Sequence, residues 1–394
     1  MLIDSQRRKF LKQLGVATAG TLVVPSFLEA STPTLIQNGR RLVVVQLAGG
    51  NDGLNTVIPF TNDTLFKARP KIAPAPGNFL KLTDEVALNA AMPGMRDLFE
   101  SGDVSILNSV GYPNPNRSHF RAMDIWQSGS GSEQYLSTGW LGRYLDNECS
   151  DQTQIPALEM GNVLSLALKG TKYKGIPVNN IYQFYQATRS VHEGQIFPKA
   201  NDATQFLYKT VADTRASAAY LFEKNKLYKT RQEYPQNALG NQLKQIARLI
   251  ISGVDAPVYY VSLGGFDTHN NQTNRQERLL RMYSDSIKSF ADELKAAREW
   301  NNTLVLTFSE FGRRVKENAS GGTDHGKANN LFLLGGNLKK PGLYNNLPDL
   351  ENTEEGDIHY EIDFRQVYST ILNKWLSADS RKILNGSFKE LGLV

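Results

Sequence analysis

Three segments decide the expected fold: A-P-V-Y-Y-V-S-L-G-G-F-D-T-H-N-N-Q (residues 256–272), N-T-L-V-L-T-F-S-E-F-G-R-R (302–314) and S-G-G-T-D-H-G-K-A-N-N-L-F-L-L-G-G (320–336). The apolar runs 258–263 and 303–308 each end at a Gly or Ser turn and predict buried strands. Between them, apolar residues recur every three or four positions and predict one face of a helix: Leu279, Tyr283, Ile287, Phe290, Leu294 and Ala297. This order predicts a βαβ unit with parallel strands.

Acidic and imidazole side chains follow these strands. Asp267 and His269 come after the first strand, Glu310 follows the second, and Asp324 and His325 stand in the next glycine-rich loop. The carboxyl ends of parallel strands share one edge of the sheet, where ligands bind in such folds. The sequence therefore predicts a functional site at this edge.

Two earlier segments follow the same pattern. Residues 41–47 predict a strand that runs into A-G-G-N-D-G (48–53), which adds Asp52, although turn chemistry alone also explains an Asn-Asp-Gly sequence. Residues 104–110 predict another strand, and Y-P-N-P-N-R-S-H-F (112–120) then begins a helix whose N-terminus favours an anion. Arg117, Ser118 and His119 would meet a phosphate or sulfate there. The alternative is that Ser118 caps the helix while His119 packs beneath it.

The residue types at these strand ends favour a divalent metal, zinc first, with manganese, magnesium or calcium as alternatives. Such an ion would activate water or polarise a phosphoryl or sulfuryl oxygen. Arg313 and Arg314 either clamp an anionic group or stand on a solvated helix start. The expected metal ligands are Asp52, Asp267, His269, Glu310, Asp324 and His325.

The N-terminus predicts export. R-R-K-F-L-K (7–12), the apolar run 14–24 and a cleavage site after Ala30 are typical of a twin-arginine signal peptide in residues 1–30. The apolar run is shorter than the roughly 20 residues that a spanning helix needs, so we expect no stable membrane span. The twin-arginine translocase is the expected partner, the location is periplasmic or secreted, and residues 31–394 are expected to form one domain.

Composition excludes other classes of protein. The chain has 394 residues, and its one cysteine, Cys149, excludes an internal disulfide framework and any multi-cysteine metal site. The formal charge of +5 is partly that of the signal peptide and is dispersed elsewhere, so a nucleic-acid partner is not expected.

The motifs G-G-N-D-G-L-N-T-V-I-P (49–59), N-R-S-H-F-R-A-M-D-I-W-Q-S-G (116–129), T-G-W-L-G-R-Y (138–144), G-G-F-D-T-H-N-N-Q (264–272), F-S-E-F-G-R (308–313), G-G-T-D-H-G (321–326) and D-F-R-Q-V-Y-S-T-I-L (363–372) together resemble the bacterial exported family called domain-of-unknown-function 1501, placed in the alkaline phosphatase and sulfatase superfamily. The resemblance implies a three-layer α/β/α sandwich around a large, mostly parallel sheet. It also implies one metal at Asp52 and a second at Asp267, His269 and His325.

Two departures from the superfamily pattern affect the expected chemistry. Ser309-Glu310 stands where active members usually carry Asp-His, and Pro113 stands at the nucleophile position of the sulfatase motif Cys/Ser-x-Pro-x-Arg. Ser118, Asn55 and Thr56 are the possible substitutes.

The first hypothesis is an exported metal-dependent hydrolase of phosphate or sulfate esters, whose substrate is a small anionic ester or a glycan. In this hypothesis Arg117 and Ser118 are the catalytic candidates, with attack by metal-activated water if no covalent intermediate forms. The alternative is a non-catalytic periplasmic binding or envelope-assembly protein that keeps the phosphatase-like fold.

Overall fold

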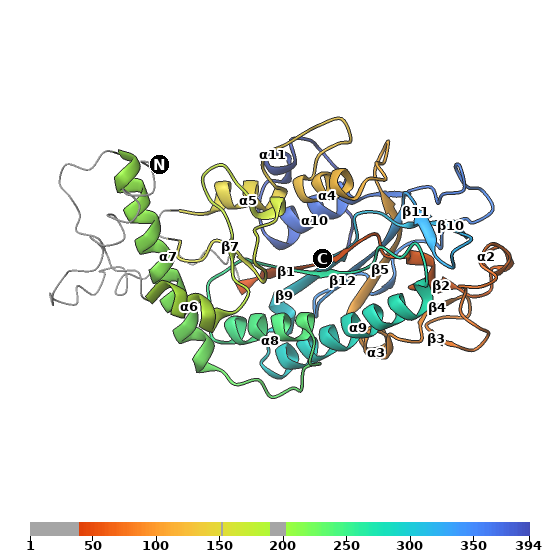
Figure 1. Ribbon diagram of the computed structural model, residues 1–394, viewed down its shortest axis with the longest axis horizontal. Coiled ribbons are helices and arrows are strands. Elements are labelled where there is room, and N and C mark those ends of the chain that lie inside the picture. Colours follow the sequence, from red (N-terminus) through yellow and green to blue (C-terminus); the bar gives the residue numbers. More distant parts are fainter. Residues whose placement is uncertain (1–38, 151–152, 190–201) are drawn as a thin grey trace, which may run out of the picture.

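The computed structural model describes residues 39–150, 153–189 and 202–394 (Figure 1). The expected signal peptide, residues 1–30, lies outside these ranges. A nine-stranded sheet runs through the molecule in the order β13-β5-β12-β9-β1-β8-β6-β7, with β14 paired to β5. Its strands are β1 (Arg41–Ala48), β5 (Val104–Gly111), β6 (Leu158–Glu159), β7 (Ile176–Pro177), β8 (Val258–Gly264), β9 (Thr303–Phe308), β12 (Asn329–Leu334), β13 (Gly342–Leu343) and β14 (Ile362–Asp363).

Strand β1 occupies the middle of the sheet. It pairs in parallel with β8 on one side and with β9 on the other, so the predicted βαβ strands flank it. Its residues alternate between the faces: Leu42 and Val44 belong to one hydrophobic cluster, Val43 and Val45 to the other. All four side chains are at most 1% exposed, and each such burial contributes about 1.5–3 kcal/mol.

The other pairings in the sheet are parallel except those of β12, which runs antiparallel to both β5 and β9. The strands predicted at 41–47, 104–110, 258–263 and 303–308 are all present. Strand β6 is short, because only Leu158 and Glu159 pair with β8. The mostly parallel sheet that the sequence predicts is confirmed.

Helices cover both faces of the sheet (Figure 1). The helices α3 (Pro93–Glu100), α8 (Ala238–Ile251) and α9 (Gln272–Ala296) pack on one face, with α6 (Ile181–Arg189) and α7 (Asp202–Leu227) beside them. The helices α4 (His119–Ser128), α5 (Trp140–Glu148), α10 (Phe364–Thr370) and α11 (Ser380–Leu384) pack on the other. The expected three-layer α/β/α arrangement is therefore confirmed.

The last helical segment begins with a capped end. Asp363 is the N-cap of α10, since its carboxylate accepts a hydrogen bond from the backbone nitrogen of Arg365 (3.0 Å). The helix then passes into a π-turn at Ile371–Trp375, and α11 follows.

Two small sheets flank the large one. Strands β2 (Val57–Pro59), β4 (Val86–Asn89) and β3 (Phe79–Lys81) form the first, next to the short helix α2 (Asp63–Ala68). The second is a hairpin of β10 (Arg313–Glu317) and β11 (Thr323–His325). Residues 309–312 lead directly from β9 into β10, so the hairpin lies beyond the carboxyl end of β9. No helix among the described residues combines the length and the hydropathy that crossing a bilayer requires.

Candidate metal centre

The loop after β8 brings Asp267 and His269 to the carboxyl edge of the sheet. The loop after β1 packs directly against it: a Cβ atom at Gly49 would lie 2.4 Å from the backbone nitrogen of Asp267. Gly49 also has a φ of +117°, which side chains rarely allow. Glycine is therefore required at this position for the two loops to meet.

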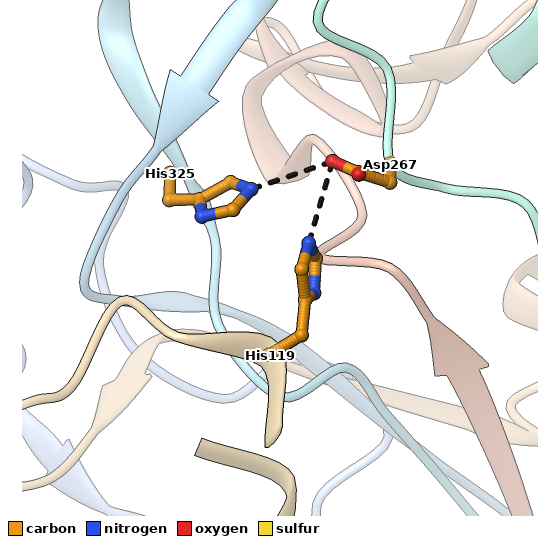
Figure 2. Close-up of side chains that lie close together, drawn as sticks. All are labelled: His119, Asp267 and His325. Carbon is orange, nitrogen blue, oxygen red and sulfur yellow. Dashed lines mark hydrogen bonds and ion pairs between the residues drawn. The ribbon is translucent and has the colours of Figure 1, made fainter. Parts of the chain in front are cut away.

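Two further histidines come from distant elements. His119 is the first residue of α4, and His325 ends strand β11. Figure 2 shows both imidazole rings pointing at the carboxylate of Asp267. The Nε2 atoms of His119, His269 and His325 lie 3.4, 3.1 and 3.3 Å from Asp267 Oδ1. The ligand atoms of His119, Asp267 and His325 lie within 4.8 Å of one another and face a common point. His269 borders this group, because its Nε2 lies 2.9 Å from that of His325.

The second nitrogen of each ring faces an acceptor. His325 Nδ1 lies 2.8 Å from the Arg117 carbonyl oxygen, which only accepts, so Nδ1 must be the donor. His119 Nδ1 lies 2.9 Å from Glu310 Oε1, and His269 Nδ1 lies 3.6 Å from Asp324 Oδ1. In the neutral rings of His119 and His325, this arrangement leaves the Nε2 lone pair directed at the common point.

The surroundings shift three pKa values. Burial raises the pKa of Asp267, but the hydrogen bond from Arg313 and the charge of that guanidinium outweigh it and lower that pKa to about 2. The hydrogen bond to Glu310 raises the pKa of His119 above 6.5, against burial. Burial lowers the pKa of His325, and the charge of Arg313 adds to this. Asp267 is thus an anion, and His325 a neutral imidazole, at neutral pH.

The donor set fits a divalent metal. His119 Nε2 is buried and makes no hydrogen bond among the described residues, as expected for a nitrogen that awaits a ligand. Two ligand atoms at about 2.0–2.1 Å from a tetrahedral zinc ion lie roughly 3.3 Å apart. Here the three Nε2 atoms lie 3.1–3.4 Å from Asp267 Oδ1, and those of His269 and His325 lie 2.9 Å apart. The ligand atoms of His119, Asp267 and His325 all lie within 4.8 Å of one another.

Glu310 serves the site through His119. Its side chain is fully buried, and Oε1 accepts hydrogen bonds from the Gly49 backbone nitrogen (2.8 Å) and from His119 Nδ1. It therefore orients an imidazole, whereas the sequence predicted it as a metal ligand. Asp324 has the corresponding position behind His269, at 3.6 Å, and its side chain is 57% exposed.

Asp52 lies apart from this group. Both of its carboxylate oxygens are engaged, by the Leu54 backbone nitrogen (3.1 Å), by Arg69 Nη1 (2.7 Å) and by the Gln272 side chain. Among the described residues, Asp52 makes no hydrogen bond or ion pair with Asp267 or the three histidines, although the resemblance implied a metal at Asp52. Asp52 is instead the centre of a buried polar network.

Ser118 and Arg117, the predicted catalytic residues, have other surroundings. Ser118 is exposed at the N-cap of α4, and its side chain makes no capping hydrogen bond. The Arg117 side chain contacts Asp357 and lies 3.3 Å from Glu355. The link of Arg117 to the site is its backbone carbonyl, which holds His325.

The arginine pair after β9 is split between two environments. The Arg313 side chain is fully buried and donates hydrogen bonds to Asp267 and to the carbonyl groups of Gly49, Gly50, Phe266 and Thr323. Arg314 is half-buried, and its carbonyl accepts from Arg69. Arg313 thus fixes the loop that carries Asp267, which neither of the two sequence interpretations anticipated.

Replacing Glu310 by glutamine tests its role as a positioning residue. Loss of such an outer partner typically weakens metal binding by about 10–100-fold. We expect that decrease in zinc affinity, measured by competition with a chromogenic chelator, with unchanged far-ultraviolet circular dichroism. Zinc affinity equal to that of the wild type would contradict the role. Asp324→Asn, at a longer and more exposed contact, should have a smaller effect.

Acidity should stabilise the metal-free protein through His119. Its folded pKa is raised, so its contribution is fully present below the unfolded pKa and is lost as pH rises through the folded value. Between about pH 6 and about pH 8, the Tm of chelator-treated wild type should therefore fall more steeply than that of His119→Asn. Equal slopes in calorimetry would show that His119 is not linked to folding in this way.

No curated protein matches the chain. Solved structures match at low sequence identity. The lipoteichoic acid synthase LtaP from Listeria monocytogenes is 9% identical with a TM-score of 0.37, over 86% of this chain and 74% of that one. The PsFucS1 sulfatase from Pseudoalteromonas sp. is 14% identical with a TM-score of 0.40, over 98% and 74%.

A third similar structure is the C-terminal periplasmic domain of EcEptC from Escherichia coli, solved in complex with Zn. It is 11% identical with a TM-score of 0.35, over 75% of this chain and 72% of that one. Among protein families, residues 104–387, well over half of the chain, match the family described as "Protein of unknown function (DUF1501)", and the chain therefore belongs to that family.

Proposed function

We propose that the protein is a metal-dependent hydrolase of phosphate or sulfate esters. The observation that carries the proposal is the convergence of His119, His269, His325 and Asp267, with the Nδ1 atom of each imidazole facing an acceptor. This donor set favours zinc among the divalent ions. When bound, such an ion supplies a Lewis acid and lowers the pKa of water.

The residues of the site have different roles in this proposal. The three imidazoles and the Asp267 carboxylate would hold the ion. Glu310 and the Arg117 carbonyl keep two of the rings in one tautomer and one orientation. Arg313 keeps Asp267 ionised and in place, because it donates to the carboxylate from a buried position.

Water is the proposed nucleophile. Ser118, the serine nearest in sequence to His119, is exposed at the start of α4. A Ser118→Ala variant should therefore keep the turnover of the wild type. Loss of turnover with retained metal would instead make Ser118 the nucleophile, as the covalent alternative from the sequence requires.

A second candidate function is that of a non-catalytic binding protein. It is favoured because Arg117 and Arg313, the arginines next to the site, are already paired. Arg117 is paired with Asp357 and Glu355, and Arg313 is saturated by carbonyl groups and Asp267. Hydrolysis of anionic esters benefits from cationic groups that neutralise charge in the transition state. A site that lacks a free arginine suits binding better than turnover.

The proposal includes export of the folded protein by the twin-arginine translocase to the periplasm or beyond, with residues 31–394 as one domain. A reporter fused to residues 1–40 tests export. Export should stop when Arg7 and Arg8 are both replaced by lysine, and unchanged export would reject the twin-arginine route.

Elemental analysis tests whether the protein holds a metal. Protein purified without added metal should carry about one divalent ion per chain, and His269→Ala and His325→Ala should carry far less. A wild type free of metal would reject both the centre and the hydrolase. If metal is present, turnover is measured with aryl phosphates, phosphodiesters and aryl sulfates. Turnover of any of them supports the hydrolase, and no turnover of any of them supports the binding protein.

A further inference from the structure

A cavity of about 680 Å³ adjoins the candidate metal centre. Residues 112–117 after β5 line it together with Lys327, Glu354, Glu355, Ile358, His359 and Tyr360. Arg117 stands two residues before His119, and Lys327 two residues after His325, which limits the separation along the chain to about 7 Å. The Arg117 carbonyl bonds to His325 while its side chain lines the cavity, so one residue borders both places.

The charges in this cavity are neutralised within its wall. Lys327 Nζ lies 2.7 Å from a carboxylate oxygen of Glu354 and 4.0 Å from one of Glu355. The Arg117 guanidinium contacts Asp357 and lies 3.3 Å from Glu355. Paired charges of this kind do not select a free ion, but they leave donors and acceptors available to a neutral polar ligand.

The rest of the lining is polar and aromatic. Asn114, Asn116 and His359 offer amide and imidazole groups, and Tyr360 contributes an exposed ring, whereas the Tyr112 ring is buried. The Tyr360 side chain is 40% exposed at the mouth, although most large hydrophobic side chains of the chain are buried. A ligand with many hydroxyl groups and an apolar ring face uses all of these features, since hydroxyl groups both donate and accept and a ring face stacks on tyrosine.

Each of the two segments that line the cavity contains a residue with a positive φ value. Asn114 and Glu355, one from each lining segment, have φ values of +53° and +56°. A glutamate in this region is strained, and such residues gather at ligand sites, where the surrounding structure holds them. The volume lies within the range of about 300–1,000 Å³ that is usual for ligand pockets.

We propose that this cavity binds a neutral carbohydrate chain, and that it seats the sugar part of an ester substrate next to the candidate metal centre. The inference rests on the proposed function for the role of the bound sugar. The binding itself does not depend on the metal, which allows the two to be tested apart.

The experiment titrates the full chain with neutral hexasaccharides of glucose, galactose, mannose and xylose in α and β linkage, followed by saturation-transfer NMR and calorimetry. The variants are Tyr360→Ala and Glu354→Gln. The matched control is Glu351→Gln, an exposed glutamate of the same segment that does not line the cavity. Tyr360→Phe retains the ring and controls for folding, and His269→Ala removes a metal ligand.

We expect at least one hexasaccharide to bind, and Tyr360→Ala and Glu354→Gln to weaken it by about tenfold or more. Tyr360→Phe, Glu351→Gln and His269→Ala should remain within about twofold of the wild type. No binding up to about 10 mM, or binding unchanged in both cavity variants, overturns the inference.

Sugar binding and metal binding can be told apart in the same variants. Equal loss of sugar binding in His269→Ala and Tyr360→Ala would assign the sugar to the metal centre and also overturn the cavity site. A wild type that binds sugar but holds no metal supports the cavity and rejects the hydrolase.

Discussion

His119→Ala is expected to remove zinc from the protein almost completely. Outer partners of metal ligands are typically worth about 10–100-fold in affinity, so the loss of a direct ligand should cost at least about 100-fold. His119 Nε2 is a buried nitrogen, 3.4 Å from Asp267 Oδ1, that has no hydrogen bond within the described part of the chain, and alanine provides no ligand atom to replace it. Zinc affinity from chelator competition, together with metal content after dialysis, measures the effect.

The control for this prediction is His359→Ala. His359 is exposed and lines the neighbouring cavity, so its loss removes an imidazole without touching the candidate centre. Metal content should then equal that of the wild type. The prediction fails if His119→Ala retains zinc while His269→Ala and His325→Ala lose it, because the centre would then be built without α4.

The strand ends were predictable from the sequence because parallel strands deliver their following loops to one edge. Asp267 and His269 lie at the site for that reason, whereas His325 reaches it from the β10–β11 hairpin that follows β9. The position of His119 was not predictable in the same way. A histidine at the start of a helix faces either the core or the site according to how that helix lies on the sheet, and its hydrogen-bond partner Glu310 comes from a remote segment. The available signal was its place directly after a predicted strand and loop.

Asp52 illustrates the opposite error. It follows β1 as Asp267 follows β8, so the strand-end argument treats the two carboxylates alike. The structure separates them because Arg69, from the end of α2, donates to Asp52. A side chain's partner depends on tertiary packing, and periodicity along the chain carries no information about it. Arg313 was missed for the same reason, since its acceptors are backbone carbonyls from three different loops.

Arg69→Met is expected to lower the free energy of unfolding by about 3–5 kcal/mol, because it leaves the charge of Asp52 buried without its partner. Both side chains of this ion pair are 0% exposed, and the pair is 2.7 Å long. Arg69 also donates to Asn55 Oδ1 (3.0 Å) and to the carbonyl groups of Val315 (2.8 Å) and Arg314 (2.8 Å), so its loss uncouples α2 from the β10 hairpin. Urea unfolding followed by circular dichroism measures the change.

The double variant Asp52→Asn/Arg69→Met distinguishes a buried charge from lost packing. Removing both charges should recover part of the stability lost in Arg69→Met, because no unpaired ion then remains in the interior. Arg381→Met, which breaks an exposed pair with Asp379, should change stability little. If Arg69→Met behaved like Arg381→Met, then Asp52 would be free to leave Arg69, and a metal-binding role for this carboxylate would again be open. The buried pair argues against that outcome, since neither group has access to water in the folded protein.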